Sequence, residues 1–365
     1  MAHALTLRSN GFTEMAFVGE TPWHGLGQEL TEGASIEEWI AAAGMEWRIQ
    51  RSKVRYHFGH DAADFATWDD KHVLFRSDTK APLGMVSPAY KPVQPREVVE
   101  FFRDLVENAG YKLHTAGTIH GGRKLWALAK VAEAAIGADK IGGFLLLSTA
   151  CDGTMETEAR FTTVRVVCNN TLTMARGEGA ANVKIGHRSR FDADKVKAQM
   201  GLATDRFASF MDEADKLAMK KVTQADAESF VRELLRPAEK NAAKVAEAVA
   251  ISTEAAQVAI AQASGSDSDF ARLLSGGVAV KATMPADDGK RAPKGEAEIL
   301  RLFAGKGRGS DLESARGTAW GLVNAVTQYV DHESGAKSID HRLDRAFFGT
   351  GEDLKNRAMV AALAL

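Results

Sequence analysis

Several cationic side chains are concentrated in the middle of the chain, where they are suited to binding the phosphates of one nucleic-acid strand. Guanidinium and ammonium groups bind phosphate oxygens, and a groove at a sheet edge can follow a single strand while an aromatic ring stacks on its bases. Glu156 and Glu158 lie among these residues, so an ordinary surface of salt bridges is an equally good interpretation. The predicted phosphate-binding residues of this patch are Arg123, Lys124, Arg160, Arg165, Lys184, Arg188 and Arg190.

A second basic segment, Ala304–Ser310, combines Lys306 and Arg308 with glycines in the sequence AGKGRGS. It lacks the GxxxxGK[ST] order of a P-loop, so it does not predict a nucleotide site. Because glycine lets backbone N–H groups approach phosphate oxygens closely, we expect Lys306 and Arg308 to cover a bound strand. The alternative interpretation, which the composition favours, is a solvated connector.

Two histidines and an aspartate, His57, His60 and Asp61, lie close together in the segment HFGHD. Imidazole and carboxylate groups are ligands of zinc and other transition metals. No matching cluster of cysteines or histidines follows, so this spacing is more typical of a surface turn. The sequence therefore predicts no metal site and no other cofactor.

Cys168 is a candidate nucleophile, but catalysis would need a base beside an exposed thiol. The segment VRVVCNNTL is instead typical of the end of a buried strand, with a cap at 169–171. Cys151 and Cys168 are the two cysteines of the chain, too few for a disulfide framework. We predict no catalytic residue and a reducing, cytoplasmic setting.

Two apolar segments are interpreted as packing elements. Trp23, in the loop PWHGLG, is expected to anchor that loop rather than to stack on bases. The segment Gly317–His332 is expected to form a helix that lies mainly in the core, where Asn324 and Thr327 need hydrogen-bond partners. This helix is therefore expected to dock a helical part of the protein on a β-rich part.

The elements that must position these residues begin with a long β-hairpin. An apolar run, the pair Asp152–Gly153 and a β-branched run predict two antiparallel strands within 142–167. A two-residue turn would pair Phe144 with Phe161 on an apolar face, opposite a face that is half polar. We therefore expect a sheet with one side exposed to water.

The rest of the chain predicts an α+β fold with a β-rich first part and a mostly helical second part. Pro95 suits the first turn of a helix that packs on the strands and ends at Gly110. β-Branched and aromatic runs predict strands at 54–58, 72–75 and 124–131. The 3.6-residue spacing of apolar residues predicts helices at 192–218, 224–235, 237–263 and 312–332.

The composition sets further bounds. A chain of 365 residues with 45% hydrophobic residues can bury a full core, and we divide it at a boundary between 1–190 and 191–365. A net charge of −2 excludes the strongly basic composition of a dedicated duplex-binding protein. No apolar run is long enough to span a bilayer, so no membrane partner is expected. Turn residues predict a linker at 264–268 and an exposed loop at 284–296.

Several motifs taken together resemble the phage/plasmid-like protein family, a domain of unknown function carried by phages, prophages and conjugative plasmids. The resemblance spans almost the whole chain and implies a protein of the bacterial host cytoplasm that acts in phage or plasmid DNA metabolism. It transfers no catalytic residue. The motifs that carry it are PWHGLG, FRSDTKAPLGMVSPAYKPVQ, RVVCNNTL, TAWGLVNAVTQYVDH and RAFFGTGEDLKNRA.

The hypothesis that combines these observations is a non-enzymatic protein that binds and anneals single-stranded DNA. Its architecture is similar in outline to single-strand annealing proteins, although no annealing motif is present. Assembly into a ring or filament would repeat a modest patch many times, so that weak contacts add through avidity. The alternatives are a module that binds a host defence or restriction protein and, third, a metal-dependent nuclease that uses His57, His60 and Asp61.

Overall fold

The computed structural model describes most of the chain, and the statements below concern that part. The predictions for Trp23, Cys168, the helix 237–263, the linker 264–268 and most of the loop 284–296 lie outside it. The described residues are 6, 11–19, 26–61, 63–165, 170–173, 182–200, 203–236, 295–335, 345–346 and 349–365.

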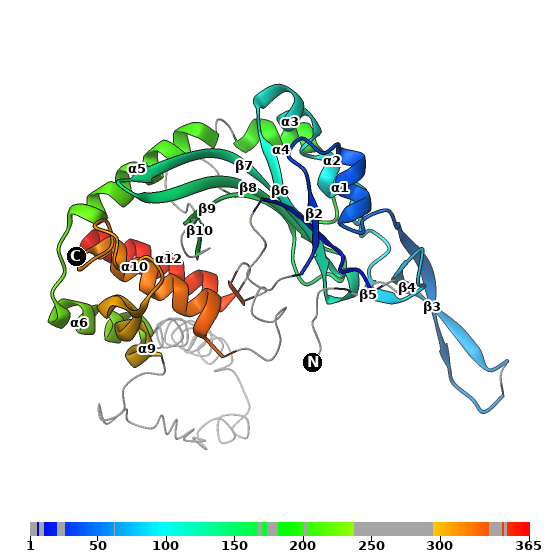
Figure 1. The fold of residues 1–365 in the computed structure, drawn as a ribbon. Coiled ribbons are helices and arrows are strands. Elements are labelled where there is room, and N and C mark those ends of the chain that lie inside the picture. Colours follow the sequence, from blue (N-terminus) through cyan, green and yellow to red (C-terminus); the bar gives the residue numbers. More distant parts are fainter. Residues whose placement is uncertain are drawn as a thin grey trace, which may run out of the picture.

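A large curved sheet forms the centre of the protein, with helices packed along it, as Figure 1 shows. Neighbouring strands are antiparallel, except that β1 and β2 run parallel. The strand order is β10-β9-β8-β7-β6-β1-β2. β11 also pairs with β9, along the part of that strand that β10 does not cover. The bounds are β1 Met15–Val18, β2 Gln28–Leu30, β6 Lys112–Ile119, β7 Lys124–Ile136, β8 Asp139–Ala150, β9 Thr157–Arg165, β10 Asn170–Thr173 and β11 Asn182–Ile185.

The long hairpin of β8 and β9 exists, but the predicted register is wrong by one residue. Leu145, not Phe144, lies opposite Phe161. The cause is the connection, which is a loop spanning 151–156 rather than a two-residue turn. In this loop the Asp152 carboxylate accepts hydrogen bonds from the backbone N–H and the hydroxyl of Thr154, at 3.0 and 2.6 Å.

The expectation that one side of this hairpin faces water is also wrong. Every residue of β8 from Ile141 to Ala150 is buried, which requires cover on both faces. On one face, the ring of Phe207 from α5 (Ala203–Met219) packs against Gly143. On the other face, Phe144 joins a small apolar cluster with Leu146.

Two short helices replace the single helix predicted at 95–110. These are α2 (Pro95–Glu100) and α3 (Arg103–Ala109), separated at Phe101 and Phe102. Both of these aromatic rings are buried, at 1% and 0% exposed, and they contact each other edge to face. The predicted end is confirmed, because Gly110 ends α3 in the left-handed conformation with φ 72°.

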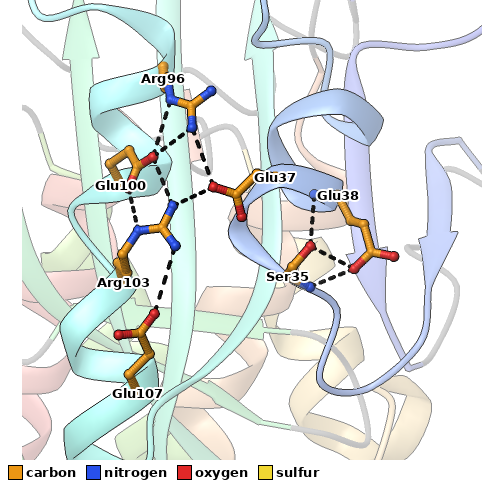
Figure 2. A network of polar contacts seen from close by, with 7 residues as sticks. All are labelled: Ser35, Glu37, Glu38, Arg96, Glu100, Arg103 and Glu107. Atoms are coloured by element: carbon orange, nitrogen blue, oxygen red, sulfur yellow. Dashed lines mark hydrogen bonds and ion pairs between the residues drawn. The ribbon is translucent and has the colours of Figure 1, made fainter.

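A network of ion pairs on the surface joins these helices to α1 (Ile36–Ala42), as Figure 2 shows. Glu37 of α1 accepts hydrogen bonds from Arg103 at 2.7 Å and from Arg96 at 3.4 Å. Both arginines also bind Glu100. The hydrogen bond from Arg103 holds the pKa of the Glu37 carboxyl below its ordinary value. The network therefore links α1 to α2 and α3 across the surface.

The second part of the described chain is mostly helical, as predicted. The helix predicted at 192–218 corresponds to α4 and α5 in the described residues, and α6 begins and ends as predicted. The helix predicted at 312–332 begins only at Ala319 and ends in a π-helical turn, Tyr329–Glu333. None of the described helices is long and apolar enough to cross a membrane. The remaining bounds are α4 Ala193–Met200, α6 Gln224–Leu235, α9 Glu296–Arg301, a π-helical turn Leu302–Lys306, α10 Ala319–Gln328 and α12 Thr350–Ala364.

Helix α10 lies in the core along its whole length, as the sequence predicts. Two of its buried polar side chains bond to carbonyls of the same helix, whereas the Trp320 indole donates to Asp139 of β8 at 3.0 Å. Asn324 donates to the carbonyl of Trp320 at 2.8 Å, and Thr327 donates to the carbonyl of Val323 at 2.9 Å. The two parts are joined further by the packing of Phe207 on Gly143 and by charged groups, described below.

A second sheet of three strands forms a narrow ribbon, residues 49–86, that projects from the body in Figure 1. Its strands are β3 (Ile49–His57), β4 (Phe65–Arg76) and β5 (Pro82–Val86), all antiparallel. The outer half of the ribbon contains β3 and β4 alone. Among the described residues, no layer packs beneath the side chains of this half, and most of them are exposed.

Candidate nucleic-acid interface

The ribbon has two chemically different faces, because side chains alternate along β3. Ser52, Val54 and Tyr56 lie on one face, and Lys53 and Arg55 lie on the other. Residues directly opposite each other on paired strands share a face. Trp68 lies opposite Val54 and therefore on its face, and Phe65 lies opposite His57, on the same face as Arg55. We call these the aromatic face and the cationic face.

The aromatic face exposes large apolar side chains to water. Of the nine large apolar side chains that are exposed in the described part of the chain, five belong to the ribbon. Tyr56 and Trp68 are 52% and 43% exposed on the outer half, and Met85 is 51% exposed nearer the body. A soluble protein rarely gathers such side chains without a binding partner.

Cations lie over two of the exposed rings. The Arg55 guanidinium is 4.9 Å from the centroid of the Phe65 ring on the cationic face. The Lys71 ammonium is 5.9 Å from the centroid of Trp68. Lys71 belongs to a bulge in β4, since the register passes from Lys53 opposite His72 to Val54 opposite Trp68. Rings beside cations are the combination that binds stacked bases together with their phosphates.

The base of the ribbon is fixed to the body by a buried arginine. Arg76, 3% exposed, donates to Glu14 at 2.6 and 3.0 Å and to Asp78 at 2.8 and 3.0 Å, and it lies 4.1 Å from the centroid of Trp47. Its guanidinium holds the pKa of Asp78 below the ordinary value. Glu14 also accepts a hydrogen bond from Thr118 of the large sheet. The ribbon therefore has a rigid base.

A segment with two exposed arginines lies against this base. The carbonyl of His187 accepts a hydrogen bond from the N–H of Lys91 at 2.6 Å. The imidazole ring of His187 stacks on the ring of Tyr90, with 4.5 Å between the two centroids. Tyr90 is buried, which raises the pKa of its hydroxyl, and it donates to the carbonyl of Ala150 at 2.7 Å. Arg188 and Arg190 follow directly and are exposed, so they lie beside the base of the ribbon.

Three further predicted residues lie at this end of the large sheet. Arg123 is exposed, and its carbonyl accepts a hydrogen bond from the backbone N–H of Cys151, the first residue of the β8–β9 loop. Lys124 is partly buried at the start of β7. Lys184 is exposed on β11, opposite Glu158. The structure therefore brings these three and the two arginines of the 186–190 segment to one end of the sheet.

Arg160 and Arg165 are not surface groups, so the expectation that they lie on an exposed patch is wrong. They are 2% and 3% exposed because β9 has strands on both sides and helices over its faces. Arg160 donates to Glu352 of α12. Arg165 donates to both carboxylate oxygens of Asp139 at 2.8 Å, and this carboxylate also accepts from Trp320 at 3.0 Å. These ion pairs join the sheet to the helical part.

Lys306 and Arg308 are exposed, but at the opposite end of β9. The carbonyl of Arg308 accepts a hydrogen bond from the Arg165 guanidinium at 3.2 Å, whereas β11 pairs with the end of β9 near Thr157. Eight residue steps along a strand separate these ends by about 25 Å. The structure therefore does not bring Lys306 and Arg308 together with the arginines at the ribbon base.

The metal alternative gains no site among the described residues, and the candidate nucleophile Cys168 lies outside them. Among the described residues, no three His, Cys, Asp or Glu side chains are placed to hold a metal ion. His57 and His60 lie at the outer end of the ribbon, where His57 contacts the edge of Phe65. Cys151 is buried, and burial raises the pKa of its thiol to about 12, so it is a poor nucleophile.

The sequence analysis missed the aromatic side chains of the ribbon. The segment 54–58 was expected to be a strand, but its alternation of Val54, Tyr56 and Phe58 with Arg55 and His57 was not interpreted as an exposed pair of faces. A short strand with aromatic residues on one face and cations on the other is the signal that could have identified this site.

Comparison with known proteins gives one match. A family model described as "Domain of unknown function (DUF932)" matches residues 82–347. No curated protein and no solved structure matches the chain.

Proposed function

The chain belongs to this DUF932 family of unknown function, and we propose from its own geometry that it binds single-stranded DNA through the ribbon and the cations at its base. The phage or mobile-element setting, and a role in strand annealing, are part of the same proposal. They rest on the resemblance of the sequence motifs described above. No catalytic residue is assigned.

The observation that carries the proposal is the exposure of Tyr56, Phe65 and Trp68 on a narrow ribbon, with cations over two of the rings. Unstacked bases offer flat apolar faces to such rings, and each stacked base contributes about 1–3 kcal/mol. Bases in a duplex are already stacked and cannot be reached in this way. The ribbon therefore favours a single strand over a double strand.

The phosphates are assigned to the exposed cations near the base. Arg188 and Arg190 lie beside Lys91, and Arg123 lies at the same end of the sheet. A local group of this kind lets a chain with a net charge of −2 bind a polyanion, because surface charges act over about one Debye length, roughly 10 Å in 0.1 M salt. Arg160 and Arg165 are excluded from this role by their burial.

Assembly into a ring or filament remains part of the proposal. A single ribbon offers few rings, so the affinity of one copy for DNA is expected to be modest. Several copies on one strand would raise the overall affinity by 10²–10⁴-fold, roughly, without new contacts. Mass photometry with and without DNA measures this directly.

The test is binding to a labelled oligo-dT across a salt series. Tyr56→Ala with Trp68→Ala is expected to weaken binding with little change in the salt slope, because the rings carry no charge. Arg188→Glu with Arg190→Glu is expected to weaken binding and reduce the slope. Matched controls are Met219→Ala, an exposed apolar side chain far from the ribbon, and Lys216→Glu on α5.

Absence of binding at low salt would overturn the proposal and favour a host protein as the partner. Unchanged affinity in both double variants would overturn the assignment of the site. Equal loss in the control variants would show a general effect of surface substitution rather than a site.

A further inference from the structure

Strand β3 leaves its outer edge without a neighbouring strand. It is the first strand of the order β3-β4-β5, and no strand pairs with its other side in the described part of the chain. The other strands that end a sheet, β2, β5, β10 and β11, have three to five residues, whereas β3 has nine. The outer part of β4, residues 65–71, is also open on the side away from β3, but it carries Asp69 and Asp70 rather than a pair of cations. A long open edge offers backbone N–H and C=O groups to an incoming chain.

The direction of these backbone groups follows from contacts at the two ends of β3. At the start, Ile49 donates its N–H to the Gln94 side chain at 2.8 Å, so its backbone polar groups point away from β4. At the other end, the N–H of Phe58 points inward to the carbonyl of Asp64, at 3.0 Å. Because direction alternates, Lys53 and Arg55 present their backbone groups outward.

The side chains of this edge select for acidic neighbours. Lys53 and Arg55 lie on the cationic face, and Val54 and Tyr56 lie on the aromatic face between them. Lys53 also pairs with Asp69 at 3.3 Å, but both side chains are exposed, so this ion pair is weak and exchanges readily for a carboxylate of an added strand. Like charges that lie directly opposite each other destabilise a pair of strands. Pairing of β3 with β3 of a second copy would align these cations and is therefore disfavoured. An added strand with carboxylates at every second position and apolar or β-branched residues between them complements both faces.

The base of the ribbon limits where such a strand can lie. Gln94 occupies the outer edge at Ile49, and the Arg51 side chain is bound to the carbonyls of Pro88 and Tyr90. The stretch from Lys53 to His57 lies beyond these contacts. It offers room for a strand of about five residues, the usual length of a strand in globular proteins.

We infer that the β3 edge from Lys53 to His57 binds an extended acidic peptide segment of a partner protein by strand addition. The inference goes beyond DNA binding, because it depends on backbone hydrogen bonds along an edge rather than on base stacking. Main-chain hydrogen bonds would supply the affinity, and the alternating carboxylates would supply the selectivity.

The probes are synthetic peptides measured by fluorescence polarisation with the full chain and no DNA. The first alternates Glu and Val over eight residues. The second has the same composition arranged as a Glu block followed by a Val block. A third and a fourth carry N-methyl groups on one or the other alternating set of amides. We expect the alternating peptide to bind about tenfold tighter than the block peptide, and one N-methyl set to abolish binding while the other has little effect.

The matched protein variants are Arg55→Ala and Arg55→Pro. Both remove the guanidinium, but only proline also removes the outward N–H. We expect weaker binding for the alanine variant and a further loss for the proline variant. If the proline variant unfolds the ribbon, the N-methyl peptides provide the same comparison on the wild-type chain.

Equal binding of the alternating and block peptides, or equal effects of the two N-methyl sets, would overturn the inference. A different result would identify the edge as part of a nucleic-acid site instead. In that case oligo-dT of equal charge would displace the bound alternating peptide, and the two N-methyl sets would not differ. Peptide binding by a protein that fails to bind oligo-dT would support the inference while overturning the proposed function.

Discussion

The indole N–H of Trp320 donates a hydrogen bond to the carboxylate of Asp139 at 3.0 Å, although the two residues are 181 positions apart in the sequence. Asp139 is fully buried and also binds Arg165 and Ser314. One carboxylate at the start of β8 thus joins this strand to β9, to the segment before α10 and to α10 itself.

Substitution of this carboxylate is expected to be severe. Asp139→Ala leaves the buried guanidinium of Arg165 without its counter-charge, and breaking a buried pair in this way costs about 3–5 kcal/mol. The free energy of unfolding from urea denaturation measures the loss. Asp69→Ala is the control, because its ion pair with Lys53 is exposed and is expected to contribute about 1 kcal/mol or less. A similar loss in both variants would contradict the assigned role of Asp139.

The exposed rings of the ribbon are expected to matter for binding and not for folding. Trp68→Ala is expected to change the free energy of unfolding by about 0.5 kcal/mol or less, because the side chain is 43% exposed and belongs to no core. Trp39→Ala, in the core at 2% exposed, is the contrasting variant and is expected to cost about 3–5 kcal/mol. Comparable losses would mean that the ribbon rings are packed in solution.

Cys151 is expected to resist thiol reagents. Burial raises the pKa of its thiol to about 12, so at pH 8 the reactive thiolate is scarce as well as inaccessible. In a Cys168→Ser background, labelling by a thiol reagent is expected to occur at the rate of global unfolding. Denatured protein provides the rate for an accessible thiol, and a native rate close to it would refute the assignment.

His114 is expected to make stability depend on pH below neutrality. Burial, and to a smaller extent Lys130, lowers the pKa of its imidazole below the ordinary value of 6.5. The unfolded chain therefore takes up a proton first as the pH falls, and the contribution of His114 to stability is present above pH 6.5 and lost below it. His114→Phe is expected to reduce the pH dependence of the free energy of unfolding between pH 6.5 and 5. His60→Ala, at an exposed position, is expected to retain the wild-type pH dependence.

Much of the architecture follows from local sequence signals. The helix Gln224–Leu235 was predicted at its observed bounds from its apolar period, and the structure shows that Thr223 and Asp226 form a capping box at its start. Gly110 ends α3 for an equally local reason, since only glycine enters the left-handed conformation without strain. The α+β class and the order of the β-rich and helical parts are likewise confirmed.

The errors arose where distant parts of the chain decide the outcome. The hairpin register depends on a loop in which the N–H of Cys151 donates to the carbonyl of Arg123, the residue before β7, a contact that no local pattern indicates. Arg160 and Arg165 were expected at the surface because arginine is usually exposed. Their burial depends on Glu352 and Asp139, the first of which is 192 positions away.

The two arginines of β9 have a consequence for the chain as a whole. Arg160 and Arg165 are five positions apart, so they leave the strand on opposite faces, and both have contacts beyond residue 190: Arg160 with Glu352 and Arg165 with Gly309. A fragment ending at 190 would keep both guanidinium groups in its interior while losing these partners. The β-rich part is therefore expected not to persist as an autonomous fragment, and the intact chain should melt in one cooperative step.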